Sequence, residues 1–462
     1  MKSLLTLLVL LGVSACSGGS GSSAGGTQTG GGQPLQSALQ GAWERPGYGT
    51  ALRISGGTLT RYDFTAETCV LSERNSLTSL SGVSLQDDGQ TFSLQQTPLA
   101  FPERYIRRSS LPPGCGSQAG RSPRDIYDHV WHTLNDYYAF FVERDVNWQA
   151  RRDVTRDRLS DTMTDADLFA LLSEMLAPLD DEHVLLQTDE QTFNPARPKG
   201  FIAQLIAEFE AQNEIPELGT YFDQELSRWD NTLRRVYLDN QVSTAGDGAF
   251  TWGIIDGTVG YLRIDAMLLN LESSVVQQVE QAQPMLDTLF SDLGTTQAMI
   301  VDLRLNGGGA DAFALAIAQR FADAERLVVS KFTRTREGEG PVQHMSLAPL
   351  DRPSYLKPVA LITSGFTTSA AEVFTLAMRA WPQVTHIGER TNGALSDVLE
   401  KPLPNGWQLE LSNEVYLDAE GVSHEAVGIP VQVAVPVFGL AERMAGEDSA
   451  VNGALDVLGF LR

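Results

Sequence analysis

From residue 253 onwards, short continuous apolar runs alternate with stretches of helical periodicity. Continuous apolar runs of this kind are typical of strands that are buried on both faces. We expect strands at 259–264, 298–303, 359–363 and 384–387, helices at 275–289, 312–321 and 370–380, and a closing amphipathic helix at 452–461. Strands that alternate with helices predict βα units with crossover connections around a buried sheet. The pattern therefore predicts an α/β core, which we place at residues 246–462.

The preceding segment, residues 122–190, shows helical periodicity without strands. Apolar side chains recur three and four positions apart over 125–141, and a second amphipathic helix is predicted to begin at Thr164. This second pattern stops just before His183. Residues 191–245 are polar with several aromatic side chains, and we interpret them as an inserted helical arm.

Residues 37–118 show a third pattern, in which apolar and polar residues alternate over short stretches such as 51–54 and 58–62. Gly-Gly and Asp-Asp-Gly sequences separate these stretches, which is typical of antiparallel strands joined by turns. We predict a small all-β domain here. The two cysteines of this region, Cys69 and Cys115, form an even pair that favours a disulfide in an exported protein. Two free buried thiols are the alternative.

The N-terminus indicates export. Residues 1–15 contain a basic residue and the apolar run 4–11, which is too short to span a bilayer and is typical of a signal peptide. The run ends at Cys16, and this arrangement resembles the lipobox of bacterial lipoproteins, in which that cysteine carries the lipid. An ordinary cleaved signal is the alternative. Residues 16–36 are rich in Gly, Ser, Thr and Gln, and we predict a flexible tether.

Composition narrows the functional classes. The formal net charge of -24 repels nucleic acid and anionic lipid headgroups, so we expect no nucleic-acid partner. A hydrophobic fraction of 42% is ordinary for a globular protein with a real core. We also expect no metal site, because His424-Glu425 lacks the second histidine of a zinc-binding motif.

Three segments could carry chemistry. Ser369-Ala-Ala-Glu372 follows a predicted strand and opens a predicted helix, so it is either a capping box or an exposed nucleophile at a helix N-terminus. The segment 302–309 ends in three glycines, which allow either a tight turn or a loop whose N–H groups face a cleft. His183 lies where helical periodicity ends, so it is either a helix-end residue or the base that a serine nucleophile needs.

Together, these segments resemble the tail-specific (C-terminal processing) serine peptidases of the tricorn-core type. The resemblance covers about residue 125 to the C-terminus and rests on an ordered set of motifs. These are Val130-Trp131, 137–141, Asn147-Trp148, 176–183, 302–309, 369–372, 388–393 and 428–430. The family implies a crotonase-like α/β fold with a ββα core and a helical N-terminal segment, here preceded by the small all-β domain.

The resemblance also implies roles for particular residues. Ser369 would be the nucleophile, His183 the general base and Glu425 the acid that orients the imidazole. Gly308 and Ala370 would supply the N–H groups of an oxyanion hole.

Two positions depart from the family patterns. Glu182 occupies the position beside the histidine where tricorn has a serine, so it would be a possible relay. The Ser–Lys branch of the family would place its lysine near Ala394, and Lys401 lies too far along the chain to match. We therefore expect substitution of Lys401 to have little effect on activity. No segment resembles the PDZ domain that many members use to recognise C-terminal tails.

The implied function is that of a serine endopeptidase that cleaves unfolded or tail-exposed polypeptides. It would need no cofactor and would be anchored in the cell envelope through Cys16, facing the periplasm. Two alternatives remain: a catalytically silent protein that binds apolar ligands on the same fold, and an envelope scaffold lipoprotein. The sequence leaves the oligomeric state open.

Overall fold

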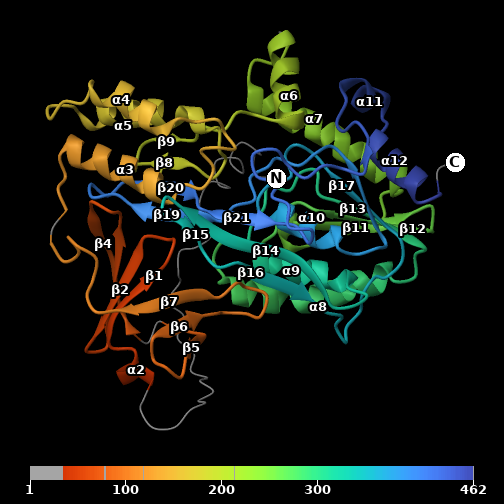
Figure 1. The fold of residues 1–462 in the computed structure, drawn as a ribbon. Coiled ribbons are helices and arrows are strands. Elements are labelled where there is room, and N and C mark those ends of the chain that lie inside the picture. The colour runs from red at the N-terminus through yellow and green to blue at the C-terminus, as the bar shows by residue number, and fades with distance from the viewer. Residues whose placement is uncertain (1–34, 78–79, 118, 213, 461–462) are drawn as a thin grey trace.

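A seven-stranded mixed sheet forms the centre of the C-terminal part of the chain (Figure 1). The computed structural model describes residues 35–460, apart from 78–79, 118 and 213. In spatial order the strands are β10 (Val242–Ala245), β11 (Phe250–Ile255), β12 (Val259–Ile264), β13 (Ala298–Asp302), β17 (Val359–Thr363), β18 (Val384–Gly388) and β22 (Val433–Ala434). The strands from β12 to β22 are parallel, whereas β10, β11 and β12 pair antiparallel. All four strands predicted in this region are confirmed.

Helices cover both faces of this sheet, as a parallel sheet requires. Along β13, Met299 and Val301 face one hydrophobic cluster, whereas Ala298 and Ile300 face another. The first cluster is closed by α8 (Val275–Leu293), α9 (Asp311–Ala318, continued by a 3-10 turn at Gln319–Phe321) and α10 (Ala370–Arg379). The second is closed by α6 (Gly200–Ala211), α7 (Leu218–Thr232, followed by a π-helical turn at Leu233–Tyr237) and α12 (Ser449–Val457).

The predicted C-terminal helix differs from the structure at both ends. α12 begins at Ser449 because the Asp448 carboxylate caps it, accepting hydrogen bonds from the N–H groups of Ala450 and Val451. The helix ends at Val457. A short helix, α11 (Leu440–Ala445), precedes it. The inserted arm consists of α6 and α7, which rise above the sheet in Figure 1.

Two smaller sheets link the core to the preceding helical segment. One contains β14 (Arg326–Thr335), β15 (Gly338–Glu339), β16 (Gln343–Leu347) and β21 (Glu414–Leu417). The other contains β19 (Val398–Pro402), β20 (Gln408–Ser412), β8 (Leu185–Gln187) and β9 (Thr192–Phe193). Because β20 pairs with β8, the chain just after His183 is joined to the C-terminal half. The helices α3 (Pro123–Tyr137), α4 (Trp148–Arg156) and α5 (Asp165–Leu176) pack against this second sheet.

The N-terminal part forms its own antiparallel sheet, drawn in red and orange in Figure 1. A short helix, α2 (Leu35–Ala38), precedes it. Its strands lie in the order β4 (Cys69–Ser76), β3 (Thr58–Phe64), β2 (Thr50–Ser55), β1 (Gly41–Arg45), β7 (Glu103–Arg108), β6 (Thr91–Leu94) and β5 (Val83–Leu85). Trp43 and Phe92 are fully buried at its centre. Cys69 and Cys115 form a disulfide with a Cα–Cα distance of 5.0 Å, as predicted from their even number.

The predicted signal peptide, the lipidation residue Cys16 and most of the predicted tether lie outside the described residues. Within the described part of the chain, no helix combines the length and the apolarity needed to cross a bilayer.

Candidate active site

The site lies where two parallel neighbouring strands, β13 and β17, end. The carboxyl ends of parallel strands meet at one edge of a sheet, so the loops 303–310 and 364–369 that follow these strands are adjacent. Three hydrogen bonds join the two loops. Thr367 Oγ1 donates to the Leu303 carbonyl at 2.9 Å, Ser364 Oγ donates to the Arg304 carbonyl at 2.7 Å, and the Thr368 N–H donates to the Asn306 carbonyl at 3.2 Å.

Ser369 occupies a strained backbone conformation between this loop and α10. Its φ is 59° and its ψ is -129°, a region that residues other than glycine rarely adopt. Its N–H donates to the Ala394 carbonyl at 3.0 Å, which anchors the turn from outside. The Ser369 side chain makes no capping hydrogen bond, so the capping-box alternative is wrong. The Ser369 hydroxyl is therefore available for another interaction.

Glu372, the other half of the supposed capping box, hydrogen-bonds the neighbouring segment 391–394, and its carboxyl also interacts with the backbone of Ser369. Its Oε1 accepts hydrogen bonds from Thr391 Oγ1 at 2.6 Å and from the Gly393 N–H at 2.9 Å, and its Oε2 accepts from the Ala394 N–H at 2.9 Å. Burial raises the pKa of this carboxyl to about 7.

The polar residues of the segment 302–309 hold the loop in place. Asp302 and Arg304 form a buried ion pair, with 2.6 Å between Arg304 Nη2 and Asp302 Oδ2, and Arg304 also contacts Asp448. Asn306 Nδ2 donates to the carbonyl of Ile264 at the end of β12 at 3.0 Å. These contacts explain why polar residues follow an apolar strand here.

Gly308 allows this loop to lie directly against Ser369. A Cβ at this position would lie 2.7 Å from the Ser369 Cβ, and the residue has a φ of +106°. Its N–H, however, donates to Asn306 Oδ1 at 2.9 Å. Gly308 was predicted as an oxyanion donor; in this structure its amide donates to Asn306 instead, so it would have to release this acceptor first. The N–H groups of Ala370 and Gly309 have no acceptor among the described residues.

His183 lies in a turn after the 3-10 helix Ala177–Leu179, so it is not a helix-end cap. Asp180 adopts a left-handed conformation, with a φ of 48°, and the His183 N–H donates to Asp181 Oδ1 at 2.9 Å. The imidazole is 9% exposed, and its Nδ1 is buried without a hydrogen-bond partner. Among the described residues its ring makes no hydrogen bond.

Asn392 connects the histidine turn to the nucleophile loop. Its N–H donates to the Thr367 carbonyl at 3.0 Å, and its Nδ2 donates to Glu182 Oε2 at 2.7 Å. Lys199, just before α6, donates from Nζ to the Asn392 carbonyl at 3.1 Å. The predicted relay Glu182 therefore binds an amide side chain, and this contact brings the residue next to His183 towards the loop that carries Ser369.

Glu425 is buried but does not form a hydrogen bond to His183. Its Oε2 accepts from the N–H groups of Leu395 at 2.8 Å and Ser396 at 3.0 Å, and its Oε1 lies 3.3 Å from Arg144 Nη2. Burial, followed by the charge of Asp181, raises the pKa of Glu425 to about 8, whereas Arg144 opposes the shift. The structure thus does not place Glu425 as the acid that orients the imidazole.

Asp397, which sequence reasoning did not assign, is within electrostatic range of His183. Desolvation by the surrounding protein raises the pKa of the Asp397 carboxyl, and the negative charge of Glu414 raises it further. Lys331 opposes this rise, and His183 opposes it more weakly. Its carboxylate is partly exposed to solvent. Nothing in the sequence separates Asp397 from the other surface carboxylates, because its proximity to His183 depends on the tertiary fold.

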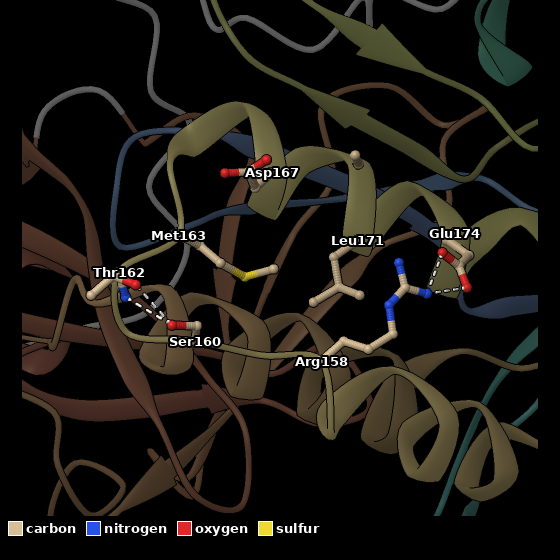
Figure 2. Close-up of a pocket in the computed structure, with 8 residues that line it drawn as sticks. Arg158, Ser160, Thr162, Met163, Asp167, Leu171 and Glu174 are labelled. Carbon is tan, nitrogen blue, oxygen red and sulfur yellow. Dashed lines mark hydrogen bonds and ion pairs between the residues drawn. The ribbon is translucent and has the colours of Figure 1, made fainter.

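Figure 2 shows a pocket that lies between α5 and the loop joining α4 to α5. Its volume is about 380 Å³, and its lining includes Arg158 and Glu174, which form an ion pair at 2.6 Å. None of the predicted site residues lines it. Within the described ranges, no group of three or more potential ligands is placed to hold a metal ion.

Two segments of the chain match models of known protein families. Residues 258–435 match the model of peptidase family S41, and residues 120–177 match the tricorn protease C1 domain. A carboxy-terminal-processing protease of Bartonella bacilliformis is 26% identical over 181 residues, which are 39% of each chain. The chain thus spans well under half the length of this curated relative. A crystal structure from Parabacteroides merdae, of a protein assigned as a peptidase, is 26% identical with a TM-score of 0.59. The alignment covers 73% of this chain and 97% of that one.

These matches show that residues 258–435 are similar to peptidases of family S41 and that part of the chain is similar to a carboxy-terminal-processing protease. The preceding helical segment, residues 120–177, is similar to the tricorn protease C1 domain.

Proposed function

We propose that the protein is a serine endopeptidase that cleaves unfolded or tail-exposed polypeptides in the cell envelope. The catalytic residues would lie on a crotonase-like core that is preceded by a small β-domain. The observation that carries the proposal is the strained backbone of Ser369, held between two loops with its hydroxyl uncommitted. A residue held in such a conformation needs a structure that enforces it, and this strain is concentrated at functional sites.

In the proposed reaction, Ser369 Oγ attacks the carbonyl carbon of the scissile peptide bond. His183 accepts the hydroxyl proton and then donates it to the leaving amine. The oxyanion forms at the N-terminus of α10, where the Ala370 N–H has no acceptor and the helix dipole favours negative charge. A second donor comes from the 307–309 turn, either Gly309 or Gly308 after release from Asn306. Water then hydrolyses the acyl-enzyme by the same steps.

His183 needs a contact that its ring does not make in this structure. Its Nδ1 is buried and unpaired, so closure around a substrate must bring an acceptor to it. Because catalytic hydrogen bonds are often long in the free enzyme and tighten in the complex, the absent contact is compatible with the proposed role. Asp397 is the acceptor that we favour, because it lies within electrostatic range of His183.

A fluorophosphonate probe tests the assignment. It should label the wild-type protein on Ser369 and should fail to label Ser369→Ala. His183→Ala should label at least about 100-fold more slowly, since general-base catalysis contributes about 10²–10⁴-fold. Chelation with EDTA should leave the labelling rate unchanged. Loss of labelling that zinc restores would point to a metalloenzyme, and absence of labelling in the wild type would favour a silent ligand-binding protein.

The envelope location is a separate part of the proposal. It is supported by the short apolar run that ends at Cys16, which resembles a lipobox. Stable anchoring requires more than one acyl chain, which a lipidated N-terminal cysteine would carry. Cys16→Ser should move the protein from the membrane fraction to the soluble fraction. If the variant still sediments with membranes in high salt, the lipoprotein assignment fails.

A further inference from the structure

Four successive backbone N–H groups, from Gly393 to Ser396, donate to just two buried carboxylates. Those of Gly393 and Ala394 donate to Glu372, each at 2.9 Å. Those of Leu395 and Ser396 both donate to Glu425 Oε2, at 2.8 and 3.0 Å. In an extended strand successive N–H groups point to opposite sides, so this segment is folded around its two acceptors in the manner of a backbone nest. Gly393, with a φ of +88°, allows the turn.

Both carboxylates are deeply buried, and they come from different parts of the chain. Glu372 is 0% exposed on α10, and Glu425 is 3% exposed in the loop before β22. Burying a carboxyl group is costly unless its oxygens find hydrogen-bond partners or a counter-charge. Here the N–H groups, the Thr391 hydroxyl and Arg144 provide that compensation. A surface loop would not need such partners, so the arrangement indicates that the position of this segment matters.

The segment 393–396 lies between the two halves of the proposed catalytic pair. Its Ala394 carbonyl accepts the Ser369 N–H at 3.0 Å, and this contact fixes the strained turn. Immediately before it, Asn392 binds Glu182, the neighbour of His183. A shift of the segment would therefore move Ser369 and the histidine turn relative to each other.

We propose that Glu372 and Glu425 are positioning residues that clamp the segment 393–396, and that Glu425 acts through this clamp and not by orienting His183. The inference rests on the proposed function for its effect on turnover. Its structural content, the pinning of four amides, does not depend on that function.

Variants with a neutral amide in place of each carboxylate should distinguish the contributions of Glu372 and Glu425. Both oxygens of Glu372 accept hydrogen bonds. Glu372→Gln replaces one of these oxygens with an NH2 group. In either orientation of the amide, this NH2 group then faces an N–H or hydroxyl group that needs an acceptor. In Glu425→Gln, the amide oxygen can still accept from Leu395 and Ser396, and only the contact with Arg144 is lost. We expect kcat to fall about 100-fold in Glu372→Gln, the cost of a misplacement of about 1 Å. We expect kcat to fall about 10-fold or less in Glu425→Gln, and we expect KM to change little in both variants.

Glu225→Gln is the matched control, because Glu225 is a buried carboxylate paired with Arg443, away from the site. It should lower thermal stability without changing kcat. Active-site titration with the fluorophosphonate separates positioning from misfolding. A positioning residue leaves one labelled site per chain with slower turnover, whereas partial misfolding lowers the number of sites and leaves turnover per site normal.

Three outcomes would overturn the inference. The first is a wild-type kcat in Glu372→Gln. The second is a fall of about 10⁴-fold in kcat in Glu425→Gln, together with a shift in the midpoint of the pH–rate profile, as expected for a triad acid. The third is unchanged hydrogen exchange at residues 393–396 in Glu372→Gln. The exchange measurement needs no activity, so it tests the clamp even if the wild type proves not to be a peptidase, a result that the labelling experiment reports separately.

Discussion

At the scale of single residues, the departures from ordinary backbone and side-chain preferences gather at the site. Ser369 has a positive φ, Gly308 has no room for a Cβ, and Glu372 is a buried acid. Natural chains tend to violate local rules where function requires it. The sequence identified Ser369 and Gly308 through motif resemblance. It did not identify the role of Glu372, because its partners lie about twenty residues away in a segment without regular structure.

The close approach of Gly308 to the nucleophile gives the first prediction. In Gly308→Ala the new methyl group would meet the Ser369 Cβ at 2.7 Å in a backbone conformation that alanine adopts with strain. We expect a loss of at least about 100-fold in kcat/KM, because a misplacement of about 1 Å costs that much. The control is Gly257→Ala, at a glycine with a φ of +67° and open space around it. It should cost about 1–3 kcal/mol of stability through strain alone and leave kcat/KM unchanged. Equal activity in both variants would contradict the steric argument.

Lys401 gives a prediction about stability, whereas the prediction made from sequence concerned activity alone. Its Nζ donates to Asp63 Oδ1 at 2.7 Å and to the carbonyls of Tyr48 and Gly49, and it is 1% exposed. Removing one partner of a buried pair typically costs about 3–5 kcal/mol. Lys401→Ala should therefore lower the free energy of unfolding by that amount, measured by urea denaturation, although Lys401 is not part of the site.

A double variant provides the control for Lys401. Asp63→Asn combined with Lys401→Met removes both charges, and it should recover part of the stability lost in Lys401→Ala. If the single variant is as stable as the wild type, the ion pair contributes nothing to stability.

At the scale of elements, the sequence predicts helices and strands that depend on local residue patterns. It misses strands that depend on partners far along the chain. The strands β12, β13, β17 and β18 were predictable because they are apolar on both faces. The strand β8 was not predicted, because it pairs with β20, which lies more than two hundred residues further along the chain. Three genuine capping boxes begin α3, α5 and α8. The Ser-x-x-Glu of α10 resembles them in sequence, but its flanking loops hold Ser369 out of capping geometry.

The pairing of β19 with β20 predicts a pH dependence of stability. Glu400 and Glu410 lie directly opposite each other, and burial together with the charge of Glu400 raises the pKa of Glu410 to about 8. Because the folded state holds this proton more tightly than the unfolded chain, the stabilising contribution is present below about pH 4.5. It is lost as the pH rises towards about 8. Glu410→Gln imitates the protonated side chain, so it should raise Tm by a few degrees at pH 8.5 and have little effect at pH 5.

Glu210→Gln, at an exposed position on α6, is the control for this measurement and should change Tm at neither pH. A Glu410→Gln variant that is no more stable than the wild type at pH 8.5 would show that Glu410 is not strained by its neighbour.

At the scale of the whole molecule, the N-terminal sheet is joined to the rest through buried polar contacts. Tyr48 hydrogen-bonds Glu414, and Lys401 reaches Asp63. On the side of α3, Thr68 Oγ1 lies 2.6 Å from His129 Nδ1. Phe101 packs on Tyr416, and Lys331 Nζ lies 4.7 Å from the Phe101 ring centre. Buried polar groups that lose their partners are expensive, so this interface is unlike that of two domains on a flexible linker.

The last prediction follows from this interface. Removing residues 1–121 would leave Lys401, Glu414 and His129 without their partners in the N-terminal sheet. We expect residues 122–462 alone to aggregate or to unfold at a markedly lower temperature than the full chain, as light scattering and circular dichroism would show.

A protease site inserted between Gly120 and Arg121 tests the interface without removing anything. That position lies beyond Cys115, so the disulfide stays within one fragment. After cleavage the two fragments should co-elute and retain reactivity with the fluorophosphonate. Fragments that separate in native buffer while 122–462 keeps the Tm and labelling rate of the full chain would show that the N-terminal sheet is an independent module.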